Sequence, residues 1–205
     1  MGRVAHIIGN GDNAGMYKPA KGIKLTCNVP PFEVPNAYAT TIVDFKMMAA
    51  IREGSVNPPG EWICGFRPKK YMEMKPDFYL KIAPRIKEFY TILPEYAIPG
   101  KNRGQGYTNF NCGHLATHYA ANKMKADEIH MYGFDSIFDF NMSSYSDLIL
   151  NSDRGNINNN RLINNWRPVW KGLFDEFKET QFVLYHKHPN TKIKLPKNVE
   201  VRIKN

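Results

Sequence analysis

The sequence predicts one α/β domain, in which a largely parallel β-sheet is covered by helices on both faces. Short apolar runs rich in β-branched residues alternate along the chain with segments of helical periodicity, and most of the runs stop at glycine, proline or asparagine. A chain of 205 residues is long enough for one domain with a sizeable core. We therefore predict a single domain over residues 1–205.

The first expected strand covers residues 4–8, an apolar run that stops at the turn Gly9-Asn10-Gly11. Residues 23–27 alternate apolar and polar side chains before a proline-containing break, which is typical of a second strand. The remaining strands are expected at residues 38–43, 61–65, 127–132, 182–186 and 199–203.

Helices are expected between these strands. One runs from Asp44 as N-cap to near Gly54, a second covers residues 113–125, and a third covers residues 161–178 with an interruption at Pro168. Aromatic side chains recur at helical spacing in the third helix, which indicates core packing.

Two stretches lack clear periodicity. Residues 67–106 carry several prolines and mixed charges, so we expect loops and short helices there. Residues 139–160 are polar and rich in asparagine, which predicts a mobile loop or lid.

The composition indicates a soluble cytoplasmic protein, or one in the host cytoplasm if its source is viral. No apolar run approaches the roughly 18 residues of a membrane span, and the amino-terminal apolar stretch is too short for a signal peptide. Cys27, Cys64 and Cys112 lack paired or metal-ligand spacing, which fits reduced thiols. The net charge of +9 favours anionic ligands, and the basic residues are spread along the chain rather than gathered in a DNA-binding arm.

The carboxyl ends of the predicted strands carry most of the chemistry. In parallel sheets of this Rossmann-like type, ligands bind beyond those ends. Gly9-Asn10-Gly11 resembles a phosphate-binding turn, since glycine lets backbone amides approach an anion. It has Gly-x-Gly without the full Gly-x-Gly-x-x-Gly spacing, so a plain β-turn is the alternative.

Four segments, in this order along the chain, resemble the bacterial sialyltransferases of the Campylobacter type and the sialyltransferase-like proteins related to them. They are Ile8-Gly9-Asn10-Gly11, Leu25-Thr26-Cys27-Asn28, Asn111-Cys112-Gly113-His114 and the segment from Ala126 to Ser136 that contains Gly133-Phe134-Asp135. The compact size and the absence of a membrane anchor also resemble proteins of bacteriophages.

This resemblance implies a nucleotide-sugar site, with a CMP-sugar favoured as donor. The family's nucleotide-binding positions fall on Gly9, Asn10, Gly11, Asn28, Asn111, Cys112, Gly133 and Asp135. The family uses no metal, and the spacing of Asp135 and Asp139 is wider than the Asp-x-Asp motif of metal-dependent glycosyltransferases. We therefore expect no metal and no cofactor besides the nucleotide-sugar.

The chain also departs from the family. Tyrosines that follow the Gly-x-Asp segment there are replaced by Ile137 and Phe138, and Tyr145 is the nearby substitute. The family's catalytic histidine has no counterpart in residues 136–185, which leaves His186 and His188 as candidates for the base. Their i, i+2 spacing on a strand would point both to one face, and the alternative is an exposed pair at the sheet edge.

Three further side chains are candidates for contact with phosphate or substrate: Tyr145, His114 and Arg154. His114 and His118 have the spacing of two zinc ligands in metalloproteases, but Leu115 stands where the general-base glutamate belongs. His114 follows the expected helix start, where a substrate phosphate would lie.

These observations predict a metal-independent glycosyltransferase that moves a sugar from a nucleotide donor to an acceptor hydroxyl of a glycan or nucleic acid. A non-catalytic accessory or structural subunit of a larger, viral assembly and a nucleic-acid-modifying transferase are the alternatives. A homo-oligomer or larger assembly is compatible with either, and no membrane partner is expected.

Overall fold

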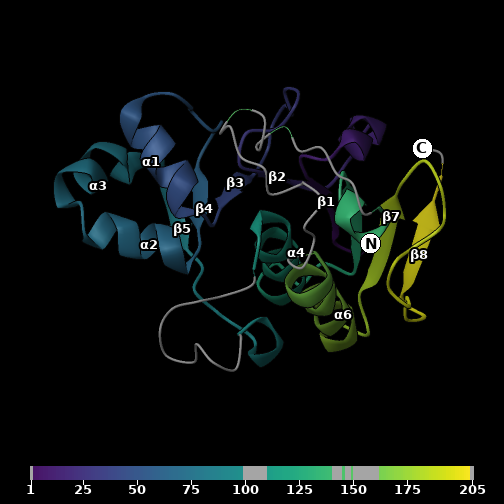
Figure 1. Cartoon of the computed structure of the whole chain (residues 1–205). Coiled ribbons are helices and arrows are strands. Elements are labelled where there is room, and N and C mark those ends of the chain that lie inside the picture. Colours follow the sequence, from purple (N-terminus) through teal and green to yellow (C-terminus); the bar gives the residue numbers. More distant parts are fainter. Residues whose placement is uncertain (1, 99–109, 140–144, 146–148, 150–161, 204–205) are drawn as a thin grey trace.

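A computed structural model describes residues 2–98, 110–139, 145, 149 and 162–203. Its centre is one sheet of eight parallel strands in the order β5-β4-β3-β2-β1-β6-β7-β8 (Figure 1). The strands are β1 Val4–Ile8, β2 Ile23–Cys27, β3 Ala39–Ile42, β4 Trp62–Cys64, β5 Ile86–Phe89, β6 Glu128–Tyr132, β7 Gln181–Tyr185 and β8 Val199–Arg202. The predicted class, an α/β domain with a parallel sheet, is confirmed.

β1 forms the middle of the sheet, between β2 and β6. Ile7 pairs with Leu25 on one side and with Met131 on the other, and all three side chains are buried. A strand covered on both faces has no solvent side, which is why the sequence of β1 is an almost continuous apolar run.

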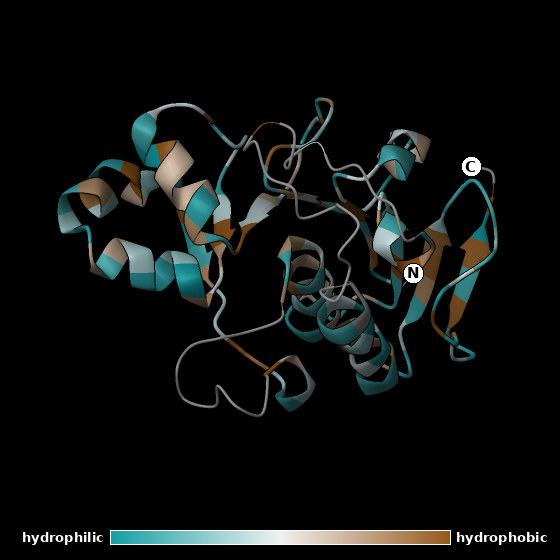
Figure 2. Cartoon of the chain, viewed as in Figure 1, coloured by the Kyte–Doolittle hydropathy of each residue, from teal (hydrophilic) through white to brown (hydrophobic). Residues whose placement is uncertain are grey.

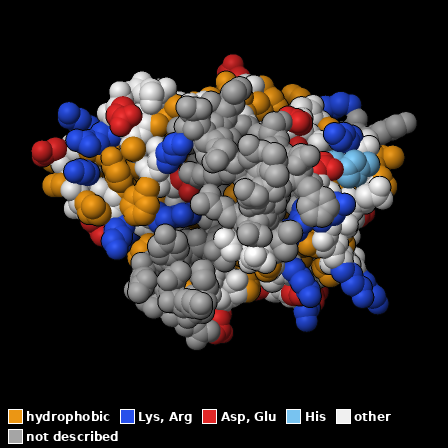
Figure 3. All heavy atoms as spheres, in the orientation of Figure 1, with side chains coloured by type: hydrophobic (Ala, Val, Ile, Leu, Met, Phe, Trp, Pro, Cys, Tyr) orange, Lys and Arg blue, Asp and Glu red, His pale blue; other side chains and the backbone are white. Residues whose placement is uncertain are grey.

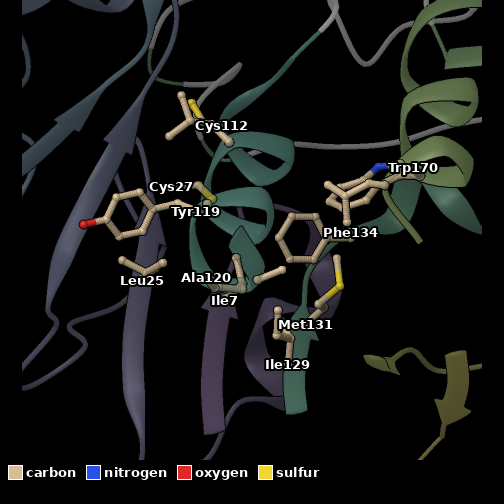
Figure 4. Packing of buried hydrophobic residues seen from close by; sticks show 14 of the residues in the cluster. Ile7, Leu25, Cys27, Cys112, Tyr119, Ala120, Ile129, Met131, Phe134 and Trp170 are labelled. Atoms are coloured by element: carbon tan, nitrogen blue, oxygen red, sulfur yellow. The ribbon is translucent and has the colours of Figure 1, made fainter. Parts of the chain in front are cut away.

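Two helices, α4 (Cys112–Asn122) and α6 (Arg167–Glu176), cover one face of the sheet (Figure 1). Figure 4 shows Ile7 and Ile129 of the sheet facing Ala120 of α4. Phe134, just beyond β6, packs edge-on against Trp170 of α6 with 5.3 Å between ring centroids. This layer is the largest part of the hydrophobic core.

The opposite face is covered by helices only over β3, β4 and β5. There α1 (Phe45–Glu53), α2 (Phe66–Glu73) and α3 (Pro76–Ile82) bury a second cluster, in which Met47 and Phe78 pack with Trp62 of β4. Over β1, β6 and β7 the same face is covered by the 3-10 turn η1 (Asp12–Met16) and by the side chains of Tyr17 and Val34. Helices thus lie on both faces, and Figure 2 shows hydrophilic stretches along their outer turns.

Residues 67–98 are more regular than the sequence predicted. Besides short helices and the 3-10 turns η2 (Ala83–Arg85) and η3 (Glu95–Ala97), they contain the edge strand β5. All four residues of β5 are only partly buried, so its sequence lacks the apolar run by which the central strands were found.

The helix expected over residues 161–178 differs at its start. Leu162–Trp166 form a π-helical turn, and α6 begins at Arg167 with Pro168 in its first turn. Proline is tolerated at that position because the first N–H groups of a helix have no partner within it. Pro168 therefore starts the α-helix and does not interrupt it.

The loop or lid expected over residues 139–160 lies outside the described residues, apart from Asp139, Tyr145 and Ile149. Within the described part of the chain, no helix has the length and apolar character needed to cross a bilayer.

Candidate functional site

The sheet order places a switch point between β1 and β6. From β1 the chain adds β2, β3, β4 and β5 outward in one direction, and from β6 it adds β7 and β8 in the other. In open parallel sheets, ligands bind at the carboxyl ends of the two strands where this direction changes. Gly9 and Gly133 follow those two strands directly.

The backbone turns after β1 and β6 are in direct contact. The Gly9 N–H donates to the Tyr132 carbonyl at 2.7 Å, and the Gly11 N–H donates to the Gly133 carbonyl at 3.1 Å. Gly133 has φ +78°, and a Cβ there would lie 2.8 Å from that of Ala14. Only glycine fits this crossing without strain.

Asn13 links the turn after β1 to the segments that follow β6 and β7. Its side-chain amide donates to Asp135 Oδ1 at 2.9 Å, and its Oδ1 accepts the Lys187 N–H at 3.0 Å. Asp135 is 5% exposed. Burial raises the pKa of its carboxyl, an effect that the hydrogen bonds from Asn13 and the charge of His186 oppose. Asp135 therefore holds the turn in place, and Asn13 is a site residue that sequence analysis did not select.

The end of β2 joins the same region. Asn28 has φ +51°, a conformation that asparagine tolerates better than most residues, and its Oδ1 accepts the Cys112 thiol at 2.9 Å. Asn10 donates its side-chain amide to the Val29 carbonyl at 2.7 Å. Asn111 caps α4 by accepting the His114 N–H at 2.9 Å.

These contacts bring together the residues that sequence analysis assigned to the nucleotide. Gly9, Asn10, Gly11, Asn28, Asn111, Cys112, Gly133 and Asp135 all lie at the carboxyl ends of β1, β2 and β6 or at the start of α4. Of the polar side chains, Asn10 and Asn111 are partly exposed, whereas Asn28 and Asp135 are buried.

The three side chains expected at phosphate or substrate have different placements. Tyr145 donates its backbone N–H to the Asn10 carbonyl at 2.9 Å, and the residue is 38% exposed. His114 is fully buried, its Nδ1 accepts the Asn111 N–H at 3.0 Å, and its ring lies 4.3 Å from that of Trp170. This placement makes His114 part of the cap of α4. Arg154 lies outside the described residues.

The two histidines expected to supply a base follow β7, next to the switch point. His186 is fully buried and stacks on Phe138, with 4.0 Å between ring centroids and 7° between planes. The side chain of His188 is 31% exposed. Asp139 joins them, because its Oδ2 lies 3.1 Å from His186 Nε2 and its Oδ1 lies 2.9 Å from His188 Nε2. Sequence analysis did not predict this pairing.

The electrostatics of this group follow from unequal burial. Burial lowers the pKa of His186, and the charge of His188 acts in the same direction, while Asp135 and Asp139 oppose the change. Burial acts against ionisation of Asp139, but the hydrogen bond from His188 and the charges of both histidines outweigh it, so the pKa of this carboxyl is lowered. Asp139 is therefore held as a carboxylate between two imidazoles.

Arg167 fixes the segment that carries both carboxylates. This buried guanidinium donates from Nε to the Ser136 carbonyl at 2.9 Å and from Nη2 to the Asp139 carbonyl at 3.0 Å. Basic side chains on the surface are scattered over the face seen in Figure 3 and do not gather into one patch on it. Sequence analysis did not select Arg167.

No protein-family model matches the chain, and no curated protein or solved structure is significantly similar to it. The Rossmann-like fold therefore rests on the topology described above, and the likeness to sialyltransferases rests on the four sequence segments.

Proposed function

We propose that the protein binds a nucleotide-sugar at the carboxyl ends of β1 and β6 and transfers the sugar to an acceptor hydroxyl. The observation that carries the proposal is the position of the turn after β1 at the switch point of the sheet. The Gly9 and Gly11 N–H groups donate to carbonyls at the end of β6, so they shape this turn and are not the groups that bind phosphate. The resemblance to sialyltransferases favours a CMP-sugar as donor.

The exposed and buried side chains have different roles in this proposal. Asn10 and Asn111 are partly exposed. Asn10 Nδ2 bonds to Val29 and Asn111 Oδ1 caps α4, so the other amide atoms, Asn10 Oδ1 and Asn111 Nδ2, are the side-chain groups that contact the nucleotide. Asn28 and Asp135 are positioning residues, because their polar atoms bond to Cys112 and Asn13 within the protein.

The transfer is a direct displacement. The acceptor oxygen bonds to the anomeric carbon while the bond from that carbon to the donor phosphate oxygen breaks, and the nucleotide leaves with the electron pair. The acceptor proton passes to a base. The group of Asp139, His186 and His188 at the end of β7 is the part of the site that would provide it.

The test is calorimetric titration of the whole chain with CMP, UDP, GDP and ADP and their sugar conjugates. Saturable binding of one class is expected, and Asp135→Asn should weaken it at least tenfold, because a hydrogen bond to a charged group contributes about 1.5–3 kcal/mol. Asp175→Asn makes the same change at an exposed position of α6 and should bind as the wild type does. Thermal unfolding checks that both variants fold.

Absence of binding across the panel would contradict the proposal and favour the non-catalytic accessory subunit. Binding of nucleic acid with a steep loss of affinity on addition of salt would favour the nucleic-acid-modifying transferase.

A further inference from the structure

We propose that Asp139, His186 and His188 form a binding site for one divalent transition-metal ion, next to the switch point. Each residue offers one ligand atom, and these atoms all lie within 4.8 Å of one another. The site is inferred from these contacts alone, and it departs from the expectation of no metal, which came from the resemblance to sialyltransferases. Only its link with sugar transfer rests on the proposed function.

The spacing of the three groups fits a common ion. Ligand atoms at about 2.0–2.2 Å from a tetrahedral ion stand about 3.3–3.6 Å apart. The two distances from Asp139 oxygens to histidine Nε2 atoms are 3.1 and 2.9 Å. These two distances run to different oxygens of Asp139, and one ligand atom from each residue lies within 4.8 Å of the others. Side-chain rotations would therefore have to bring the wider pair closer, and the ion would replace the hydrogen bonds between these groups.

The backbone at residue 188 accommodates His186 as a ligand. To bind an ion through Nε2, a neutral imidazole must carry its proton on Nδ1. His186 Nδ1 lies 3.2 Å from the His188 carbonyl oxygen and also 3.2 Å from the His188 backbone nitrogen. Nδ1 therefore has a hydrogen-bond partner in either tautomer. Without a metal ion, Nδ1 accepts the N–H of residue 188. With an ion on Nε2, Nδ1 carries the proton and donates it to the carbonyl of residue 188. Among the described residues, His188 Nδ1 has no hydrogen-bond partner, so neither tautomer of His188 is favoured by a second hydrogen bond.

The surroundings hold the group rigidly and leave one side open. His186 is fixed by stacking on Phe138, and the backbone of Asp139 is fixed by Arg167. His188 and Asp139 have side chains that are 31% and 30% exposed, so an ion and its remaining water ligands can enter from that side. A second carboxylate, Asp135, has its Oδ1 3.8 Å from His186 Nε2.

The ligand set selects the kind of ion. Two imidazoles and one carboxylate are typical of Zn²⁺ or Fe²⁺ sites that keep coordination positions open, whereas Mg²⁺ and Ca²⁺ prefer oxygen ligands. A zinc ion held by these residues would lower the pKa of a water ligand to about 7, and would in this way supply a base for the acceptor proton. The two imidazoles would then act as ligands.

The test is titration of the chelator-treated full chain with Zn²⁺ by calorimetry and with Co²⁺ by visible absorption. We expect one ion per chain, and at least tenfold weaker binding in both His188→Asn and Asp139→Asn. The side chains of His188 and Asp139 are partly exposed, so we expect both variants to fold. His186 is not replaced, because it is buried and its loss would disturb the core. Asp175→Asn is the control, because it makes the same change as Asp139→Asn at an exposed position of α6, away from the proposed site.

Failure of the wild type to bind either ion with saturation would overturn the metal site, as would unchanged affinity in both variants. The nucleotide panel, run with and without Zn²⁺, separates this proposal from the previous one. Binding of the ion without any nucleotide keeps the metal site and rejects the transferase. Binding of a nucleotide without any ion rejects the metal site and keeps the proposed transferase, in which His188 would then be the base.

Discussion

Replacing Gly11 by alanine tests how tightly the turn after β1 packs on the end of β6. A Cβ at Gly11 would lie 2.6 Å from Asp135 Oδ2 and 2.7 Å from the Gly133 carbonyl oxygen. The carbonyl belongs to the backbone and the carboxylate is held by Asn13, so neither can move away freely. Overpacking of this kind typically destabilises a protein by about 1–3 kcal/mol.

Gly15→Ala is the matched control, because Gly15 lies in η1, the turn that Gly11 caps, and a Cβ there would meet nothing within 4 Å. For a chain of this size, about 1–3 kcal/mol corresponds to a fall of roughly 2–12 °C in Tm. Differential scanning calorimetry should show that fall for Gly11→Ala and little change for Gly15→Ala. Equal Tm values for the two variants would refute the close packing from which the site is argued.

Three further predictions concern the core and its titratable groups. Trp170→Ala should lower the free energy of unfolding by about 3–5 kcal/mol in urea titrations, because the side chain is fully buried; a loss below 1 kcal/mol would show that it is not core. Burial lowers the pKa of His6 and of His130. The unfolded chain therefore takes up protons near pH 6.5 while the folded chain does not, and stability that is present above pH 6.5 should fall by up to about 1.4 kcal/mol per histidine for each pH unit below it. Urea unfolding at pH 7.5, 6.5 and 5.5 checks this, and a flat profile would contradict it. Burial raises the pKa of Cys27 and of Cys64 to about 12, so a thiol reagent should label them only after unfolding, and prompt labelling of the native protein would be inconsistent with their positions.

Local signals in the sequence were sufficient for much of the fold. The helix from Asp44 to Gly54 was predicted from its capping residues, and Gly54 indeed ends α1 in the left-handed region at φ +79°. β1 and β6 were predicted because a buried parallel strand is apolar on both faces. The edge strand β5 was missed because one partner strand and partial burial do not require such a sequence.

The sequence predicted which backbone turns of the candidate site lie together at the strand ends. It did not predict which side chains from distant parts of the chain bond to one another. Parallel strands bring their carboxyl ends to one edge, so Gly9 and Gly133 were expected to lie together. The bond between Asn13 and Asp135 joins residues 122 positions apart, and that between Asp139 and His186 spans 47 positions. Separations of this length leave no periodic pattern in the sequence, so these pairs could be found only in the folded structure.

The most direct test of nucleotide binding at the switch point is the change in backbone amide NMR shifts on addition of the nucleotide that binds in the calorimetric panel. The amides of Gly9, Gly11 and Gly133 should shift, whereas those of Gly54 and Gly60, which lie after α1 and before β4, should not. Shifts confined to other parts of the chain, with these three amides unchanged, would contradict the account.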